Sequence, residues 1–294
     1  MTHSGFAALI GRPNVGKSTL MNALVGAKVA IVSEKPQTTR HRIAGVMHRP
    51  DGQVVFLDTP GVHRPRHRLG ERMAEATASA LQGVDAALLV VDATSPVPGP
   101  GDRRAAAMVA GAGCPAYLVL NKIDAGSRAA LPVYAPLLPA LAGVFAVSAL
   151  TGQGLADLAE ALVAAMPEGP AYFPDDALTD RPDEFLMAEL VREEVFRLTR
   201  DEVPHSVHVA VDEAVERDNG TLYVAATVYV ERESQKGILI GHGGGMLRSV
   251  GAHARAQIER IFGCPVYLAL HVKVKEHWRD RAGTLENLGY RREP

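Results

Sequence analysis

A glycine-rich segment near the N-terminus has the residue types and spacing of a loop that binds phosphate groups. Residues 11–18 read GRPNVGKS, directly after the apolar run Phe6–Ile10 and at the start of a helix-like stretch, Lys17–Val25. In such a loop, backbone N–H groups and the helix N-terminus surround a phosphate, the lysine neutralises charge and the serine can ligate Mg²⁺. We expect these residues to hold the phosphates of a nucleotide: Gly11, Asn14, Val15, Gly16, Lys17, Ser18 and Thr19.

A second group of polar residues follows the apolar run Val54–Leu57. Residues 58–61 read DTPG, which on its own is more often a simple turn. Behind a phosphate loop, however, a carboxylate at a strand end can hold Mg²⁺ through water, and a glycine N–H can meet a γ-phosphate. We therefore expect Asp58 to act on the metal and Gly61, together with Lys17, on the reacting phosphate.

A third group of polar residues contains a carboxylate that can distinguish guanine from adenine. Residues 121–124 read NKID at the end of the apolar run Ala116–Leu120. The Asp124 carboxylate can accept hydrogen bonds from guanine N1–H and the exocyclic amine, and leaving it unpaired against adenine would cost about 1–3 kcal/mol. This argues against an ATP-using enzyme such as a small kinase. With residues 148–150 placing a backbone N–H near the guanine carbonyl, we expect the base to be held by Asn121, Lys122, Asp124, Ser148, Ala149 and Leu150.

The elements that must position these groups alternate between strands and helices. Repeated strand–helix units predict a mainly parallel sheet covered by helices on both faces, so the fold class is α/β with an N-terminal phosphate-loop GTPase domain. The predicted strands are Phe6–Ile10, Val54–Leu57, Ala86–Val91, Ala116–Leu120 and Val144–Val147; the predicted helices are Lys17–Val25, Leu69–Gln82, Arg103–Ala112 and Leu155–Met166.

A proline-rich stretch divides the chain into two predicted domains. Residues 167–182 hold four prolines and an acidic pair, so periodicity breaks there. We place the GTPase domain at residues 1–168, a linker at 169–182 and a second domain at 183–294. The second domain is predicted to contain helices at Glu184–Thr199 and Met246–Phe262 and strands at Val207–Val215, Thr221–Glu231 and Val266–Lys275.

The second domain carries a Gly-x-x-Gly loop at residues 241–244, formed by Gly241, His242, Gly243 and Gly244. Such a loop alone is weak evidence, but here it lies in the order helix, strand, strand, helix, helix, strand, which resembles the α+β type II KH fold. In that fold the loop clamps about four single-stranded nucleotides. We expect the loop to bind RNA.

The charge is unevenly distributed, although the whole chain has a formal net charge of −2. Residues 234–292 hold ten Lys and Arg against four Asp and Glu, whereas residues 175–233 hold six against sixteen. Basic residues of the last segment, Arg248, Lys273 and Lys275 above all, are candidates for phosphate contacts, and surface charge is the alternative for each. Arg255 and Arg279 are further candidates. Trp278 could stack on a base, although core packing is the simpler interpretation.

With these motifs in order, the sequence resembles the translation-factor-like GTPases, and the segment PQTTRH at residues 36–41 narrows this to the GTPase Era family. The resemblance covers nearly the whole chain, including LTDRP at 178–182 and KVK at 273–275. The Der family, with two GTPase domains in tandem, is excluded because the chain has one phosphate loop. One departure is His242, which stands where the family pattern carries a lysine.

The resemblance implies roles for individual residues. Thr39, or its neighbour Thr38, would close on Mg²⁺ and the γ-phosphate, so the predicted magnesium set is Ser18, Thr39 and Asp58. Val62 stands where Ras-like enzymes carry the glutamine that orients water, which implies slow turnover. Asn14 matches an asparagine that related GTPases use to hold K⁺ beside the phosphates; a loop-stabilising side chain is the alternative.

The resulting expectation is a GTPase that binds GTP or GDP with Mg²⁺, and possible K⁺, and whose KH domain binds the 3′ end of 16S rRNA during small ribosomal subunit assembly. The alternative is an RNA-binding module with a structural, slowly hydrolysed nucleotide. Cys114 and Cys264 have no metal-binding spacing, and no basic leader precedes the first strand, which indicates a soluble cytoplasmic protein. A monomer is expected, and peripheral membrane contact is left open.

Overall fold

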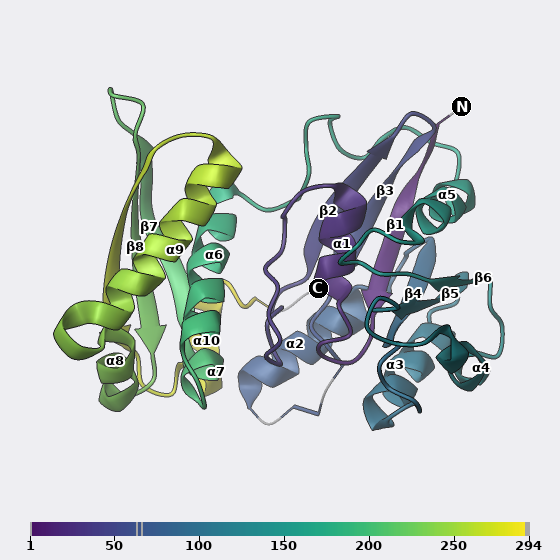
Figure 1. The fold of residues 1–294 in the computed structure, drawn as a ribbon, viewed down its shortest axis with the longest axis horizontal. Helices are drawn as coiled ribbons and strands as arrows, with labels where there is room; N and C mark the ends of the chain where they lie inside the picture. Colours follow the sequence, from purple (N-terminus) through teal and green to yellow (C-terminus); the bar gives the residue numbers. More distant parts are fainter. Residues whose placement is uncertain (1, 63, 66, 292–294) are drawn as a thin grey trace. The chain divides into compact units, whose positions relative to one another are not determined.

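The computed structural model describes residues 2–62, 64–65 and 67–291, which form two compact units (Figure 1). The first unit contains residues 2–62, 64–65 and 70–180, and the second contains residues 67–69 and 181–291. Residues 63 and 66, which fall in the segment after Gly61, and residues 292–294 of the predicted second domain lie outside the described residues.

The first unit is built on a six-stranded sheet with the strand order β2-β3-β1-β4-β5-β6. All neighbouring strands are parallel except β2, which runs antiparallel to β3. Strands β1, β3, β4 and β5 are almost continuously buried, which is why they are visible in the sequence as apolar runs. The strands are β1 (His3–Ile10), β2 (Ile43–Arg49), β3 (Gly52–Asp58), β4 (Ala86–Asp92), β5 (Ala116–Asn121) and β6 (Gly143–Ala146).

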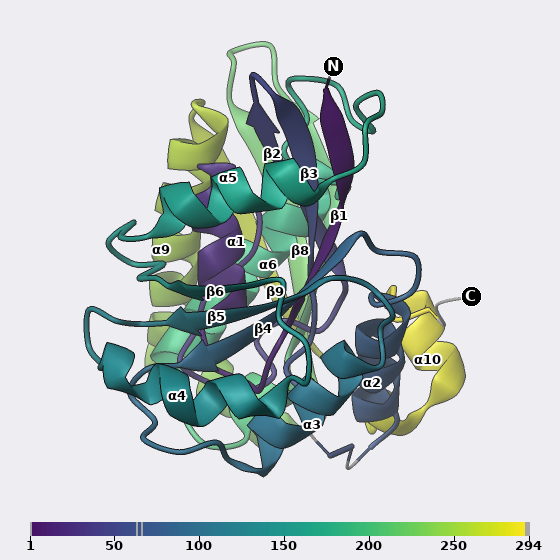
Figure 2. The same cartoon turned by 90° about the vertical axis from the view of Figure 1, so that its right-hand side faces the viewer.

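Helices cover both faces of this sheet, so the predicted α/β class is confirmed. Helices α1 and α5 pack against the strands around β3, whereas α3 packs against β4 on the opposite face (Figure 2). Helices carry the chain back across the sheet, so β1, β3, β4, β5 and β6 all run in the same direction. The carboxyl ends of these strands, where the polar motifs lie, are therefore at the same edge of the sheet. The helices are α1 (Lys17–Val25), α2 (Arg68–Ser79), α3 (Pro100–Ala110), α4 (Leu131–Tyr134) and α5 (Leu155–Ala165).

Strand β2 is the element that the sequence analysis did not predict. It follows the polar segment at residues 33–42 and ends in His48 and Arg49, so its short apolar stretch resembles the end of a loop. Pairing with the whole of β3 makes it a strand. Tertiary pairing decided this element rather than local propensity.

The proline-rich segment after α5 lies along β2 and β3 and is tied to them by hydrogen bonds. Gln53 accepts from the backbone N–H groups of Tyr172 and Phe173, at 2.9 and 3.0 Å. Further along, Val46 N donates to the carbonyl of Leu178 at 2.9 Å. The predicted linker is therefore partly docked on the first unit up to residue 180.

The second unit is a three-stranded sheet with helices packed on it. Strand β8 pairs antiparallel with β7 and parallel with β9. Val224, Ala226, Val228 and Val230 alternate along β8 and are fully buried, and the last three belong to a core to which α6 and α9 also contribute. The elements are α6 (Asp183–Leu198), α7 (Val203–Ser206), β7 (His208–Glu216), β8 (Leu222–Val230), α8 (Glu233–Ile240), α9 (Gly245–Phe262), β9 (Val266–Val274) and α10 (Ala282–Asn287). This is the predicted order, with short helices added.

Within the part of the chain that the structure describes, no helix combines the length and the apolar character needed to cross a membrane.

Candidate functional site

The predicted nucleotide motifs of the first unit meet at the carboxyl ends of its strands. Asn121, at the end of β5, is almost completely buried. Its side-chain N–H donates to the carbonyl of Val15 in the phosphate loop at 2.9 Å, and its Oδ1 accepts from Ala149 N, after β6, at 3.0 Å. Val62 N donates to the Gly11 carbonyl at 3.0 Å. Motifs separated by more than a hundred residues thus form one site.

The phosphate loop is held in a conformation that depends on glycine. Gly16 has φ +94°, and a Cβ added there would lie 2.4 Å from the Asn121 side-chain nitrogen. Lys17, at the start of α1, donates to the carbonyls of Gly11 and Arg12 at 3.2 and 3.3 Å. The loop thus leads directly into the N-terminus of α1, the kind of place where backbone N–H groups can bind a phosphate.

Burial makes the Lys17 ammonium a strong attractor for negative charge. Desolvation lowers the pKa of Lys17 to about 8, which nearby Asp58 only partly opposes and Arg12 reinforces. A phosphate group beside the ammonium would compensate for the lost hydration, so the electrostatics of the loop favour an anionic ligand.

Three oxygen-bearing side chains from separate segments form a compact cluster. Ser18 Oγ donates to Asp58 Oδ2 at 2.6 Å and lies 2.9 Å from Thr39 Oγ1, which in turn donates to Asp58 Oδ2 at 3.2 Å. Asp58 is fully buried, and its Oδ1 makes no well-formed hydrogen bond to any described residue. Burial raises the pKa of Asp58, against the opposing influence of Lys17 and of hydrogen bonds. A Mg²⁺ ion fits this oxygen cluster and would supply the positive charge that the buried carboxylate needs.

The structure also distinguishes the two adjacent threonines. Thr39 Oγ1 belongs to the cluster, whereas Thr38 Oγ1 donates to the carbonyl of Lys35 at 2.7 Å. The two hydroxyls are adjacent in sequence, but of the two it is that of Thr39 that contacts Ser18 and Asp58.

The guanine-binding segment is arranged around Asn121. The Asp124 carboxylate is exposed, as a group that receives a base must be. Within residues 148–150, the Ser148 and Ala149 amides donate to Gln153 and Asn121, and the Leu150 amide has no partner among the described residues. The Leu150 N–H is therefore the donor of this segment that is left for a base carbonyl.

The sequence analysis missed the carboxylate that connects these motifs, Asp92 at the end of β4. Asp92 Oδ2 accepts from Lys122 Nζ at 2.7 Å, and the same ammonium donates to the carbonyl of Asn14 at 2.6 Å. Burial alone would raise the pKa of Asp92, but hydrogen bonds from Lys122 and Thr94 lower it, so the carboxylate stays ionised. The sequence offered one indication of this role: Asp92 directly follows the apolar run Ala86–Val91, as Asp58 and Asn121 follow theirs.

Arg12, another residue that the motif analysis left without a role, forms its side-chain contacts with residues outside the phosphate loop. Its Nε lies 3.2 Å from Asp102 Oδ1 on α3, and a terminal nitrogen donates to Ser95 Oγ at 2.7 Å. Asp102 is almost fully buried. Arg12 therefore fastens the phosphate loop to α3.

Gly61 and Val62, described residues that follow Asp58 at the expected γ-phosphate position, have no polar side chain that could orient water. The side chain of Val62 packs against the apolar core, and a Cβ on Gly61 would lie 2.7 Å from the backbone of Pro13. Asn14 Nδ2 donates to the carbonyl of Glu34 at 2.5 Å, which is the loop-stabilising role considered above. The K⁺ role of Asn14 stays a prediction.

In the second unit, the Gly-x-x-Gly loop forms a sharp turn at the start of α9. Gly241, Gly243 and Gly244 have φ values of +71°, +55° and +78°, in the region that favours glycine. His242 and Gly243 are exposed, and a Cβ on Gly243 would meet no atom within 4 Å. The Arg248 guanidinium comes within 4.0 Å of a Cβ added at Gly244. Close backbone approach, a helix N-terminus and an arginine therefore coincide at this loop.

The other basic candidates differ in their surroundings. Lys273 is exposed, and the Lys275 ammonium lies over the Tyr229 ring, 5.3 Å from its centroid. Arg279 Nε donates to Glu231 at 3.0 Å, so its charge is compensated within the protein. Arg255 likewise pairs with Glu259 at 3.2 Å.

The suggestion that Trp278 stacks on a base is wrong. Its side chain is fully buried, and its Nε1 donates to the carbonyl of Ser206 at 2.8 Å.

Comparison with known proteins identifies the family. The 50S ribosome-binding GTPase family matches residues 6–122, and the KH domain family matches residues 202–279. GTPase Era of Carboxydothermus hydrogenoformans is 46% identical over 98% of this chain and 97% of its own length, and that of Thermotoga maritima is 48% identical over 95% and 94%. The chain belongs to the GTPase Era family. It is therefore a GTPase, as the sequence predicts.

Solved structures of Era match the whole fold. A variant of Aquifex aeolicus Era bound to GDP·AlF4⁻ has a TM-score of 0.93 and 38% identity, covering 98% of this chain and 99% of that one. Era in complex with MgGDPNP and nucleotides 1506–1542 of 16S rRNA has the same TM-score and identity, covering 99% of each chain. These structures confirm the predicted guanine nucleotide and Mg²⁺ as the cofactors of this family member.

The Thr39 hydroxyl is expected to matter for the GTP-bound form, because only it lies against Ser18 and Asp58. Thr39→Ala should lower GTP turnover at limiting Mg²⁺ by about 10-fold, with GDP affinity unchanged. Turnover measured across a Mg²⁺ titration tests this, with Thr38→Ala as the matched control. Equal losses in the two variants would contradict the assignment.

Asp92 is expected to support nucleotide affinity through Lys122. Asp92→Asn removes a charge-assisted hydrogen bond and should weaken GTP and GDP binding alike by about 10-fold. Equilibrium titration with fluorescent guanine nucleotides measures the effect. Asp51→Asn, on an exposed turn, is the control; an unchanged affinity in Asp92→Asn would remove Asp92 from the site.

Proposed function

We propose that this chain binds the 3′ end of 16S rRNA through its KH unit and acts in small ribosomal subunit assembly as a GTP-dependent switch. The observation that carries the proposal is the match over 99% of both chains to Era bound to nucleotides 1506–1542 of 16S rRNA. The exposed loop of Gly241, His242, Gly243 and Gly244, with Arg248 beside it, supplies the local chemistry for such a ligand. Lys273 and Lys275 are the further proposed RNA contacts.

The nucleotide site is proposed to consist of the motif residues predicted above, with the roles that the geometry supports. Lys17 and the loop amides bind the phosphates, Ser18, Thr39 and Asp58 hold Mg²⁺, and Asp124 with the Leu150 amide reads the guanine. The backbone N–H of Gly61 is the proposed contact to the γ-phosphate.

The switch is proposed to act on the linker through β2. The backbone N–H of Ala44 donates to Asp180 Oδ1 at 3.0 Å, and its carbonyl accepts from Thr179 Oγ1 at 2.7 Å. Ala44 lies five residues after Thr39, and the second unit begins at Arg181. Ordering of Thr39 by Mg²⁺ and γ-phosphate would therefore change the segment to which the end of the linker is fastened.

A second candidate function is an RNA-binding module in which the nucleotide is structural and slowly hydrolysed. The observation in its favour is the packing of Val62 into the core, which leaves the water-orienting position without a polar side chain. A K⁺ ion held by Asn14 would restore transition-state charge stabilisation and favour the switch.

We further propose a cytoplasmic monomer. Peripheral contact with a membrane surface is compatible with this proposal and is not required by it.

RNA affinity is expected to depend on the nucleotide and on Gly243. With a GTP analogue, an oligonucleotide of the 16S rRNA 3′ end should bind more tightly than with GDP, and Gly243→Asp should weaken binding by at least about 10-fold through charge repulsion. Fluorescence anisotropy measures both effects. Gly243→Asn, which tolerates the same backbone conformation without the charge, is the control. Equal affinity in the two nucleotide states would contradict the switch.

The same assay tests the linker contact. Asp180→Ala removes the acceptor for the Ala44 N–H and should abolish the difference between the two nucleotide states, whereas Asp180→Asn keeps an acceptor oxygen and should preserve it. A full nucleotide effect in Asp180→Ala would exclude this route.

Single-turnover hydrolysis with and without K⁺ separates the two candidate functions. The switch predicts faster hydrolysis in K⁺ than in Na⁺, and loss of that stimulation in Asn14→Ala. Hydrolysis that remains slow in both salts would favour the structural nucleotide.

A further inference from the structure

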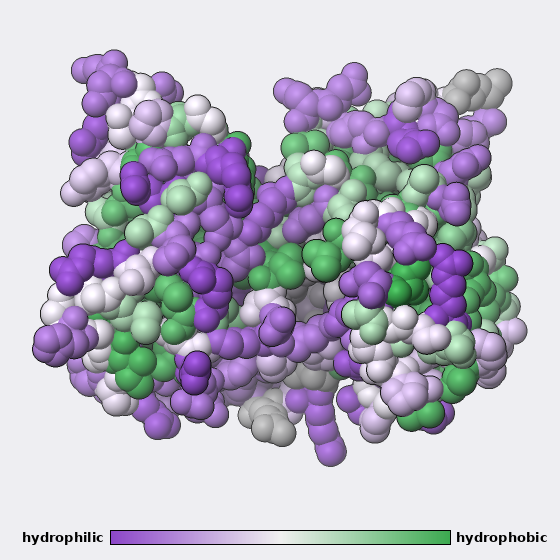
Figure 3. Space-filling model, viewed as in Figure 1, coloured by the Kyte–Doolittle hydropathy of each residue, from purple (hydrophilic) through white to green (hydrophobic). Residues whose placement is uncertain are grey.

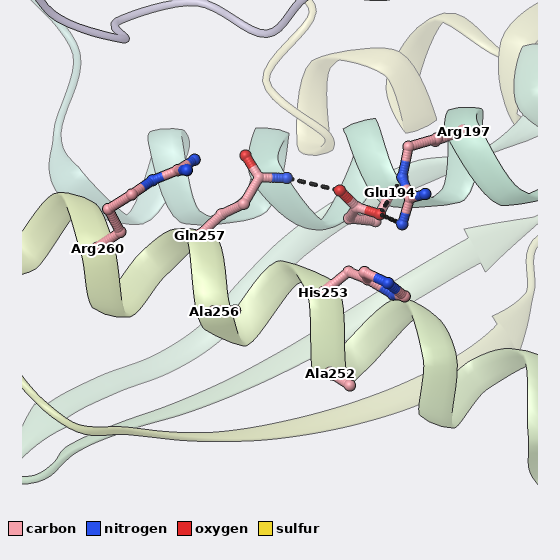
Figure 4. Close-up of a pocket in the computed structure, with 7 residues that line it drawn as sticks. All are labelled: Glu194, Arg197, Ala252, His253, Ala256, Gln257 and Arg260. Carbon is pink, nitrogen blue, oxygen red and sulfur yellow. Dashed lines mark hydrogen bonds and ion pairs between the residues drawn. The ribbon is translucent and has the colours of Figure 1, made fainter.

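The second unit has a groove between α6 and α9 that no motif accounts for. It is an open groove of about 550 Å³, with the small side chains of Ala252 and Ala256 along α9. Arg197 and Arg260 lie toward its opposite ends, with Gln257 and His253 between them (Figure 4). Hydrophilic side chains cover much of this face (Figure 3).

Arg197 is held in position by a buried carboxylate. Glu194 Oε2 accepts from Arg197 Nε at 2.7 Å, and Glu194 Oε1 accepts from Gln257 Nε2 at 2.6 Å. The Glu194 side chain is only 5% exposed, whereas that of Arg197 is 51% exposed. The two helices thus orient an arginine whose outer edge faces solvent, which reduces the entropy lost when it binds a ligand.

The groove has an excess of positive charge. Arg197 balances Glu194, while Arg260 has no carboxylate partner among the described residues. His253 Nδ1 lies 2.7 Å from the carbonyl of Ser249, so this nitrogen carries a proton and donates within α9. An anion with several acceptor oxygens matches the two arginines better than an apolar or cationic ligand.

The groove shares α9 with the Gly-x-x-Gly loop. The helix begins at Gly245, and the lining residues run from Ala252 to Arg260, about 10–22 Å along the axis at about 1.5 Å per residue. A KH loop clamps about four nucleotides, and stacked phosphates follow one another at about 3.4 Å. Exposed Arg248 lies one turn into the helix, between loop and groove. RNA that leaves the loop therefore comes within reach of the groove.

We propose that this groove binds the phosphate backbone of RNA adjacent to the nucleotides held by the Gly-x-x-Gly loop. Arg197 and Arg260 contact phosphates, and the small side chains of Ala252 and Ala256 let the backbone approach the helix. The site rests on the proposed function, because it extends the same RNA interface.

The test uses the full chain with a GTP analogue and two RNAs: a short oligonucleotide of the 16S rRNA 3′ end, and the same end extended by its neighbouring sequence. Arg197→Gln with Arg260→Gln should weaken binding of the extended RNA by about 10-fold and make its logarithmic salt dependence about 1.4 units less steep, with the short RNA unchanged. Arg104→Gln, an exposed arginine on α3, controls for charge. Arg260→Gln alone leaves the Glu194 pair intact and should give part of the effect.

The outcomes separate the groove from the proposed function. Loss confined to the extended RNA supports the groove site. Unchanged binding of both RNAs in the double variant, or equal losses on both, overturns it while leaving the KH assignment in place. Failure of the native protein to prefer either RNA over a scrambled one overturns both. Binding of a polyglutamate peptide that the double variant loses, with RNA binding intact, would assign the groove to an acidic protein segment and overturn the RNA site.

Discussion

The buried side chain of Asn121 is the interaction on which the nucleotide site depends. A single amide holds the phosphate loop by the Val15 carbonyl and the segment after β6 by the Ala149 amide. Because the amide lies in a buried position, leaving either of its ends unpaired would be costly, and the three segments are fixed together. Gly16 is required at the point where this side chain passes, since a Cβ there would overlap with it.

Around this frame the protein buries opposite charges that do not satisfy each other fully. Lys17 and Asp58 are both desolvated. Burial lowers the pKa of Lys17 and raises the pKa of Asp58, so in each case it favours the neutral form. Phosphate oxygens and a divalent cation would provide the missing counter-charges, so the electrostatics of this site favour a nucleotide with its metal ion. Asp92 is treated differently, because Lys122 and Thr94 complete its hydrogen bonds within the protein.

The two units have the same type of candidate phosphate-binding site, a glycine-containing loop at a helix N-terminus. In each, glycines with positive φ precede a helix N-terminus, so that backbone N–H groups and the helix dipole face an approaching phosphate. The end of the linker is hydrogen-bonded to β2 of the first unit. The side chains of Thr179 and Asp180 bond to the backbone C=O and N–H of Ala44. Under the proposed switch, a change of charge near Thr39 would be transmitted to the second unit through these hydrogen bonds.

The sequence by itself determined the fold class and the nucleotide motifs, because chemistry at strand ends demands fixed residue types at fixed spacing. Lys17, Asp58 and Asp124 were predicted as site residues in this way, and so was the Gly-x-x-Gly loop. The sequence analysis did not predict strand β2, because its local propensity for a strand is weak. It is an edge strand that is stabilised by pairing with β3.

Only the tertiary structure decided between neighbours that the sequence treats alike. It placed Thr39 rather than Thr38 at the oxygen cluster, paired Arg279 with Glu231 and buried Trp278. It also revealed the role of Asp92, which pairs with Lys122, and the groove between α6 and α9. Both depend on contacts between residues that are far apart in the chain. The physical reason is that hydrogen bonds, ion pairs and burial depend on which elements pack together, whereas a motif records only what lies along one segment.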